Sequence, residues 1–262
     1  MILPLFKADL HVHTCLSPCA DLSMGPHAIV AQAASNDLDV MGVCDHNSAE
    51  NAPAVVRAAR DRNIRVLPGL EITSKEEVHI LAIFDRPEQA LRLQELVYQH
   101  LSGTNEPEVF GLQPVVNEEH EVLGFNERLL AGATDLAVEE VVASIHALEG
   151  LAIASHVDRE AFGIIGHLGF IPSGLELDAL ELSPNISPEQ GRQRFARYAE
   201  LPFLQFSDAH CLEDIGKVST FFRIHEATTA EIRRALRGQQ GRRVLLAEGA
   251  VCPAAAERCK AG

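Results

Sequence analysis

The sequence has few aromatic and few basic side chains. Its 262 residues include no tryptophan, and aromatic residues make up 5% of a chain that is 47% hydrophobic. Aliphatic side chains and alanine must therefore fill the core. There are 22 Lys and Arg against 37 Asp and Glu, which gives a formal net charge of -15. This balance predicts no surface for duplex nucleic acid, which requires clustered basic residues. It permits a phosphorylated small molecule, because bound divalent cations can reverse the local sign of the charge.

Two kinds of long apolar segment are also missing. No run approaches the roughly 18 apolar residues of a membrane span, and the N-terminus lacks the basic and apolar regions of a signal peptide. We therefore expect a cytoplasmic protein without a membrane partner. Its six cysteines are then expected to be reduced thiols. Cys252 and Cys259 lie in an Ala-rich tail and are interpreted as incidental.

A His-x-His motif ends the first apolar stretch, residues 6–14. Side chains of a strand alternate between faces, so His11 and His13 point the same way. Two imidazoles on one face can hold one metal ion. Asp9 precedes them on that face and is expected to support His11 by a hydrogen bond rather than to bind metal.

Apolar runs alternate with helical patterns along the chain. Strands are expected at 6–14, 39–44, 64–70, 78–84, 150–155, 180–183, 202–206 and 243–246, and helices at 26–37, 50–62, 87–101, 135–148, 161–169, 188–199 and 228–238. This alternation predicts an α/β fold with a parallel sheet. Polar residues follow nearly every strand, which favours a closed or nearly closed TIM-like barrel over an open sheet.

We expect a single domain over residues 1–262, because no Gly/Ser linker divides the chain. Within it, residues 102–133 contain scattered Gly, Pro and Asn, and they are predicted to form an irregular segment that covers the mouth of the active site. Residues 248–262 are predicted to be a tail.

Candidate metal ligands fall at or just after the expected strands. They are His11, His13, His46, Glu71, His156, Asp208 and His210. His79 lies near the start of its own strand, and an irregular local strand is expected to bring it to the same mouth. Imidazole nitrogen and carboxylate oxygen suit Zn, Mn or Fe, and a carboxylate such as Glu71 can bridge two ions.

The segments that carry these residues resemble the ordered motifs of the polymerase and histidinol phosphatase (PHP) family. They are 9–14, 44–47, 68–73, 78–81, 154–156 and 207–210. The resemblance extends from about residue 7 to residue 240, and the motifs follow the family's order and spacing. It implies a distorted seven-stranded (βα) barrel with two or three divalent metal ions at its C-terminal mouth.

The resemblance also implies a role for each candidate. His11, His13, Glu71 and Asp208 would hold one ion, Glu71 would bridge to a second ion held by His79 and His156, and His46 and His210 would bind a third. One departure from the family concerns the loop after His-x-His, where many members place an Asp or His ligand for the third ion. Pro18 and Cys19 occupy those positions here. Proline cannot be a ligand, whereas Cys19 can bind as a thiolate.

Adjacent divalent ions lower the pKa of a bridging water, which then attacks phosphorus in line with the leaving oxygen. Asp208 or His210 can pass a proton to the leaving group. Arg159, three residues beyond His156, can clamp a phosphate with two hydrogen bonds, although a surface salt bridge explains its presence equally well. The sequence therefore predicts a metal-dependent phosphoesterase for a small phosphorylated molecule such as histidinol phosphate or a nucleotide.

Two other functions compete with this prediction. An amidohydrolase-type barrel also begins with His-x-His and ends with Asp, but it commonly uses a carbamylated Lys where this chain has Glu71. A non-catalytic metal-binding barrel with a regulatory role is compatible with Pro18. The near-complete ligand set favours an enzyme over this second alternative.

Overall fold

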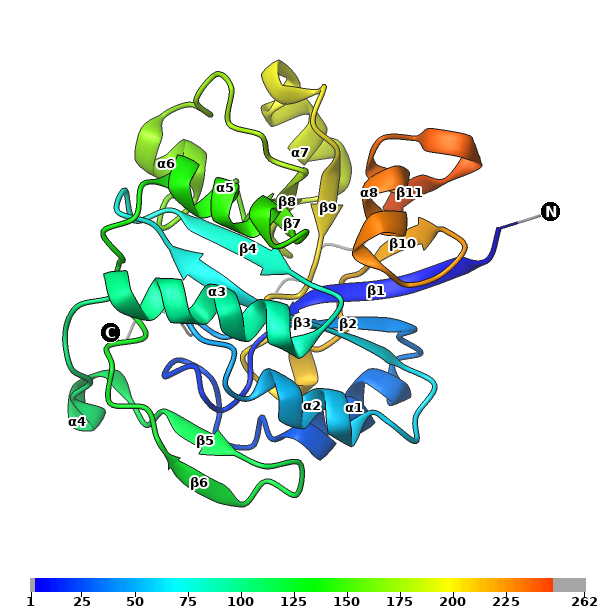
Figure 1. The fold of residues 1–262 in the computed structure, drawn as a ribbon. Coiled ribbons are helices and arrows are strands. Elements are labelled where there is room, and N and C mark those ends of the chain that lie inside the picture. Colours follow the sequence, from blue (N-terminus) through cyan, green and yellow to red (C-terminus); the bar gives the residue numbers. More distant parts are fainter. Residues whose placement is uncertain (1–2, 247–262) are drawn as a thin grey trace.

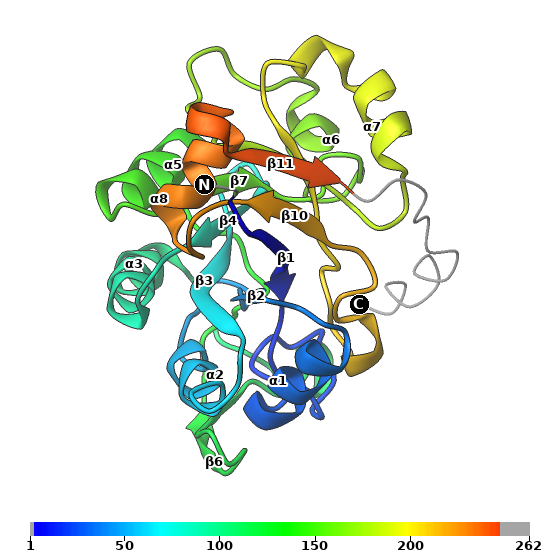
Figure 2. The same ribbon diagram turned by 90° about the vertical axis from the view of Figure 1, so that its right-hand side faces the viewer.

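The computed structural model describes residues 3–246, which form a nine-stranded sheet surrounded by helices and a separate two-stranded hairpin (Figures 1 and 2). The strands are β1 (Leu5–Val12), β2 (Val40–Val43), β3 (Arg65–Thr73), β4 (His79–Ile83), β5 (Pro114–Val116), β6 (Val122–Phe125), β7 (Leu151–Ala154), β8 (Ala179–Leu182), β9 (Phe203–Gln205), β10 (Thr220–Arg223) and β11 (Arg243–Leu246). The helices are α1 (Pro26–Ser35), α2 (Ala52–Ala58), α3 (Pro87–His100), α4 (Pro107–Phe110), α5 (Val138–Ala147), α6 (Ile164–Leu168), α7 (Pro188–Arg194) and α8 (Thr229–Leu236).

The large sheet is mixed rather than parallel. Its order is β11-β10-β1-β2-β3-β4-β7-β8-β9. Strands β1 to β3 are parallel, as are β7 to β9, whereas β4 runs antiparallel to both β3 and β7. The connection between β3 and β4 covers only residues 74–78, too short for a parallel crossover. The α/β barrel-like fold is as predicted, but the expected seven parallel strands are nine, and the four pairings of β4 and β10 are antiparallel.

The sheet nearly closes on itself at the end of β1. Val12 forms an isolated parallel bridge with Ala209, just beyond β9. The amide of His13 donates to the carbonyl of Ala209 (3.0 Å), and the amide of Ala209 donates to the carbonyl of His11 (3.2 Å). The first half of β1 instead pairs with β10, and β10 pairs with β11 on its other side. This closure brings the His-x-His motif beside residues 208–210, which are far away in the sequence.

The helices lie outside the strands, most clearly when the molecule is viewed towards the N-terminal end of β1 (Figure 2). Helix α1 begins at Pro26 and buries Ile29, Val30 and Ala33, the face that its periodicity predicts. It ends at Ser35 rather than at Asp37, whose φ of 52° is left-handed. The Thr228 hydroxyl accepts a hydrogen bond from the Glu231 amide and caps α8.

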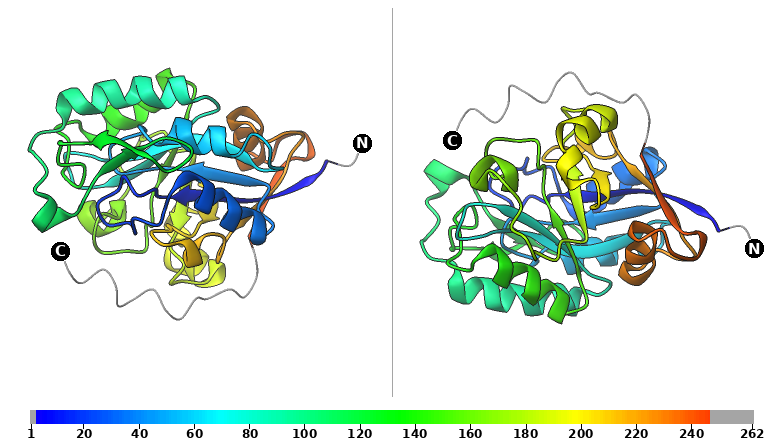
Figure 3. Two further views of the ribbon diagram at one scale, coloured as in Figure 1. Left: turned by 90° about the horizontal axis from the view of Figure 1, so that it is seen from below. Right: turned by 90° about the horizontal axis from the view of Figure 1, so that it is seen from above.

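Residues 102–133 contain loops and the short helix α4, and also the hairpin β5–β6, which was not expected. Helix α4 lies at the end of the molecule opposite the N-terminus (Figure 3). Pro68 lies inside the continuous strand β3, at the last residue that pairs with β2, so it does not interrupt the strand. The predicted tail at 248–262, with Cys252 and Cys259, lies outside the described residues.

No helix in residues 3–246 combines the length and the apolar character that crossing a bilayer requires. The cytoplasmic location stays a prediction.

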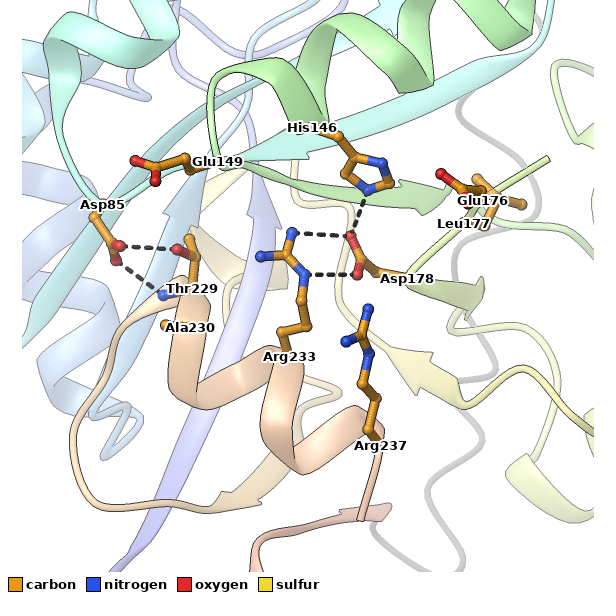
Figure 4. A pocket seen from close by; sticks show the side chains of 10 residues that line it. All are labelled: Asp85, His146, Glu149, Glu176, Leu177, Asp178, Thr229, Ala230, Arg233 and Arg237. Atoms are coloured by element: carbon orange, nitrogen blue, oxygen red, sulfur yellow. Dashed lines mark hydrogen bonds and ion pairs between the residues drawn. The ribbon is translucent and has the colours of Figure 1, made fainter. Parts of the chain in front are cut away.

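A network of charged residues joins the elements at the end of the barrel opposite the His-x-His motif. It lines a pocket of about 540 Å³ (Figure 4). Asp178, at the start of β8, binds Nε of Arg233 on α8 (2.9 Å), Nε2 of His146 on α5 (3.0 Å) and the Ala152 amide of β7 (3.0 Å). The Asp178 carboxylate therefore connects helices α5 and α8 with strand β7.

This network predicts how stability depends on pH. Burial would raise the pKa of Asp178, but hydrogen bonds from His146, Arg233 and the Ala152 amide outweigh burial and lower it from 3.8 to about 2. Because the folded pKa is depressed, the carboxylate stabilises the fold fully above its unfolded pKa, and this contribution is lost as the pH falls through about 2. Asp178→Asn should lower the free energy of unfolding by about 2 kcal/mol at pH 6 and by roughly half as much at pH 3.

Urea unfolding at both pH values measures this difference. Glu176→Gln, an exposed acid of the same pocket, is the matched control and should change stability little. Equal stability of Asp178→Asn and the parent protein at pH 6 would show that the network does not stabilise the fold. A difference that stays constant at pH 3 would show that the stabilisation does not come from the lowered pKa of Asp178.

Candidate metal centre

All the predicted ligands of the barrel meet at one mouth. His11 and His13 come from the end of β1, Glu71 from β3, and His46, His156, Asp208 and His210 from the segments that follow β2, β7 and β9. His79 is the first residue of β4. No irregular strand is needed to bring it there: because β4 is antiparallel to its neighbours, its N-terminal end lies at their C-terminal ends.

Glu71 lies at the centre of this cluster and is 1% exposed. Its Oε1 is 3.1 Å from Nδ1 of His79, 3.3 Å from Nε2 of His156 and 3.4 Å from Nε2 of His11. Its Oε2 is 3.1 Å from Nδ1 of His46. Oε2 also lies 3.6 Å from Nε2 of His13. One buried carboxylate therefore faces five imidazoles, three through Oε1 and two through Oε2.

His11, His13 and Asp208 form a compact group beside Glu71. Oδ1 of Asp208 is 3.2 Å from Nε2 of both histidines, and those two nitrogens are 3.2 Å apart. His11 and His13 are fully buried, and Asp208 is 8% exposed. With Glu71, these residues offer four ligand atoms close enough to surround one ion.

A third group lies nearer to the solvent. The ring centroid of His13 is 4.1 Å from that of His210 and 4.6 Å from that of His46. Cys19 is an exposed residue whose thiol faces His46 and His210. Desolvation would raise the pKa of this thiol, but the two imidazoles lower it to about 6. The sequence prediction that Cys19 approaches this group is compatible with that geometry.

The donor set fits divalent cations. Oε1 of Glu71 and Nδ1 of His79 are buried without a hydrogen-bond partner, and a bound cation would give both a partner. Burial lowers the pKa of His79 to about 4, so this imidazole is neutral and free to bind metal at pH 7. Burial also opposes ionisation of Glu71, but His79 and His11 hold the pKa of its carboxyl well below the usual range.

Residues behind the cluster orient its imidazoles. Both carboxylate oxygens of Glu181 are 3.0 Å from Nδ1 of His11, and Glu181 is fully buried. Nδ1 of His13 is 2.9 Å from the Ser17 hydroxyl, which donates to Asp45 (2.7 Å). Such contacts fix the tautomer and orientation of a metal-binding histidine.

Glu181 was not among the predicted site residues. Its signal in the sequence is a single charged residue within the otherwise apolar run 179–182. The structure gives Glu181 the role that was expected of Asp9. The Asp9 carboxylate instead accepts hydrogen bonds from the amide and hydroxyl of Ser207 (3.0 and 2.6 Å) and from the Gly216 amide (2.8 Å). Asp9 therefore holds the segment around Asp208 in place.

Arg159 reaches the cluster but is already paired. Its Nη1 lies 2.6 Å from Oδ2 of Asp208, and its side chain is 34% exposed. Oδ1 of the same carboxylate faces His11 and His13. The sequence-based alternative of a simple surface salt bridge does not fit, because the partner is a buried residue of the cluster.

Backbone strain accompanies three positions of the cluster. Asn47, His156 and Asp208 have φ values of 50°, 27° and 50°, in the left-handed region that ordinary residues avoid. Such conformations persist where the surroundings impose them, and they concentrate at functional sites.

Family models match most of the chain. A model of the PHP domain matches residues 9–201, and a PHP-associated model matches residues 192–240. Comparison with curated proteins gives no match.

Solved structures share the fold. The lesion-specific endonuclease PfuEndoQ from Pyrococcus furiosus has a TM-score of 0.71 and 20% identity over 93% of this chain and 58% of its own. Endonuclease Q in complex with a 27-mer duplex substrate, with an abasic lesion at the active site, has a TM-score of 0.68 and 20% identity over 92% and 58%. A candidate metal-dependent phosphoesterase from Bifidobacterium adolescentis has a TM-score of 0.53 and 19% identity over 79% and 89%. This chain thus spans less than two thirds of the endonuclease chains.

These neighbours overturn one expectation from the composition. A protein of this fold binds duplex DNA, so the predicted exclusion of duplex nucleic acid, with its restriction to a small phosphorylated partner, is wrong. The net charge of -15 sums the whole chain, whereas a substrate phosphate meets the local field of the mouth, where bound cations and Arg159 can dominate.

Proposed function

The chain belongs to the PHP domain family of metal-dependent phosphoric ester hydrolases, and we propose that it cleaves phosphodiester bonds of nucleic acid at the Glu71-centred mouth. The observation that carries this proposal is the buried cluster of imidazoles and carboxylates, in which Oε1 of Glu71 and Nδ1 of His79 lack hydrogen-bond partners. A polynuclear metal centre explains why such groups are buried together.

We propose two or three divalent ions, of Zn, Mn or Fe, in this centre. One is held by His11, His13, Glu71 and Asp208; a second by Glu71, His79 and His156; a third by His46 and His210, with Cys19 as a thiolate ligand. The first set matches one group of ligand atoms that lie within reach of one ion. The other two groups contain Glu71 with His79 and His46 with His210, and Nε2 of His156 lies 3.3 Å from Oε1 of Glu71.

When bound, divalent ions lower the pKa of coordinated water and offset charge on the phosphate oxygens. Nη1 of Arg159 binds Asp208, and the guanidinium has further N–H groups. These N–H groups donate hydrogen bonds to a non-bridging phosphate oxygen. Where the third site is empty, His210 passes a proton to the leaving oxygen, and Arg159 orients Asp208 towards the first ion. Burial would lower the pKa of His210, but Cys19 and Asp208 raise it to about 9, so without a third ion this imidazole carries a proton at pH 7, which binding of that ion would displace.

The segment 102–133 is proposed to border this mouth within a single domain. A Cβ on Gly111 would lie 2.5 Å from the Pro18 carbonyl oxygen, so the segment approaches the loop of Cys19 closely. Nδ2 of Asn47, next to His46, donates to the carbonyls of Leu130 (2.9 Å) and Gly132 (2.8 Å). Gly111 and the C-terminal end of the segment therefore lie next to residues that neighbour the third group of ligands.

Duplex DNA is the favoured substrate class because two neighbours over more than nine tenths of this chain are endonucleases. The experiment compares Mn²⁺-loaded protein on labelled single strands, intact duplexes, duplexes with an abasic site, and a phosphomonoester. Cleavage of at least one nucleic acid that stops with EDTA is the expected result. Hydrolysis of the monoester alone would replace the proposal with a phosphatase, and inactivity on every substrate would refute it.

Removing the negative charge of Glu181 behind His11 should weaken the binding of the first ion. Glu181→Gln keeps the volume but loses the negative charge that faces Nδ1 of His11, so the affinity for metal should fall about 10- to 100-fold. Equilibrium dialysis of the metal-free protein against Zn²⁺ measures the change. Glu189→Gln on the exposed face of α7 is the control, and equal affinities of the two variants would disprove the role of Glu181.

A further inference from the structure

Phe162 lies in an unusual conformation in the segment between β7 and α6. Its φ is 59°, a left-handed value that is a genuine outlier for a bulky residue. The residues after it permit a tight path: a Cβ on Gly163 would lie 2.4 Å from the Arg159 carbonyl oxygen, and one on Gly166 would lie 2.3 Å from that of Glu160. A strained residue in a closely wound segment indicates that its side chain is held in place by its contacts.

The main contact of Phe162 is His79. The two rings are stacked, with centroids 4.4 Å apart and planes inclined by 18°. The backbone also joins them, because the His79 amide donates to the Phe162 carbonyl (2.9 Å). The ring of His167 lies nearly parallel to that of Phe162 at 5.9 Å. Phe162 is 39% exposed, whereas His79 is 6% exposed.

His79, like His156, lacks the second contact at Nδ1 that holds three of the other imidazoles. Nδ1 of His11 faces Glu181, Nδ1 of His13 faces Ser17, and Nδ1 of His210 faces a backbone carbonyl. Within residues 3–246, the structure shows no hydrogen bond that orients the His79 ring, and its Nδ1 points at Glu71 without a hydrogen-bond partner. Metal-binding histidines usually have such a second contact, and at His79 the Phe162 ring stands in its place.

We propose that Phe162 is a positioning residue that fixes the His79 imidazole for the second ion. The inference rests on the metal centre of the proposed function. Rotation of the imidazole about its Cβ–Cγ bond would swing Nδ1 away from Oε1 of Glu71. The stacked ring blocks that rotation, and the carbonyl of Phe162 fixes the backbone from which His79 projects.

The test is calorimetric titration of the metal-free protein with Zn²⁺. Phe162→Ala should lose about tenfold in affinity for one ion and keep the others, because the ligands of the first ion do not touch Phe162. Phe162→Tyr retains the stacked ring and should restore parent-like binding. Phe170→Ala is the control, since Phe170 is an exposed aromatic residue a few positions along the same segment.

Circular dichroism reports whether each variant folds. If Phe162→Ala does not fold, Phe162→Leu replaces it, with the same expected loss because an aliphatic side chain cannot stack on the imidazole. A folded Phe162→Ala or Phe162→Leu variant that binds every ion like the parent overturns the inference. An equal loss of affinity for all the ions also overturns it. Failure of the parent protein to bind Zn²⁺ at all would instead refute the metal centre of the proposed function.

Discussion

Replacing Glu71 with glutamine should abolish turnover, with a loss of about 10³-fold or more, because the several kcal/mol of charge stabilisation that the ions supply depend on this residue. Glu71 faces His11, His46, His79 and His156 together. Glutamine retains the shape but offers one neutral oxygen. Both the first and the second ion should therefore bind more weakly.

The measurement is the rate of phosphodiester cleavage at saturating Mn²⁺, with metal content determined on the same samples. Glu95→Gln on the exposed face of α3 makes the identical chemical change away from the mouth and should leave the rate unchanged. A Glu71→Gln variant that retains a tenth of the parent activity would show that Glu71 does not bridge the ions.

Arg159→Ala is expected to have the second largest effect, a loss of about 10²- to 10³-fold in kcat/KM, comparable to removing a preorganised donor from a developing charge. Its guanidinium holds Oδ2 of Asp208 at 2.6 Å and is the cation available to a substrate phosphate. Arg159→Lys keeps the charge but loses the planar fork, so it should recover only part of the activity.

Steady-state kinetics on a labelled oligonucleotide separate the two roles of Arg159. Loss of the phosphate contact raises KM, whereas a displaced Asp208 lowers kcat. Arg192→Ala on the exposed face of α7 serves as the control. Parent-like kcat and KM in Arg159→Ala would remove Arg159 from the site and restore the interpretation of a structural ion pair.

Much of the site could be predicted because its residues occupy a regular position. The alternation of side chains in a strand places His11 and His13 on one face, and the ends of parallel strands place Glu71, His156 and Asp208 at the same mouth. These are local rules, and a single sequence contains what they require. The family matches over residues 9–201 and 192–240 confirm the resemblance that the motifs carried.

The direction of β4 was missed although its signal was present. Five residues separate β3 from β4, and a parallel crossover needs a dozen or more. Applying that limit would have placed His79 at the mouth without an irregular strand. Strand β10 was missed for another reason: it forms by pairing with β1, more than 200 positions earlier, and no local pattern reports such a partner.

The roles of Glu181 and Phe162 could not be predicted from the residue type at each position. Each acts through contact with a ligand that is distant in sequence: Glu181 lies 170 positions from His11, and Phe162 lies opposite His79. A buried charge in an apolar strand and an aromatic residue in a loop are individually unremarkable. Their roles depend on the closure of the sheet and on the path of the segment before α6.

The most direct test of the metal-dependent phosphodiesterase is the cleavage rate of a labelled abasic duplex by metal-free protein as Mn²⁺ is added. We predict no cleavage without metal, a saturable rise that is complete at two or three ions per chain, and no rise in Glu71→Gln. Cleavage that persists in EDTA, or a metal-saturated protein that leaves the duplex and every other phosphodiester intact, would contradict it.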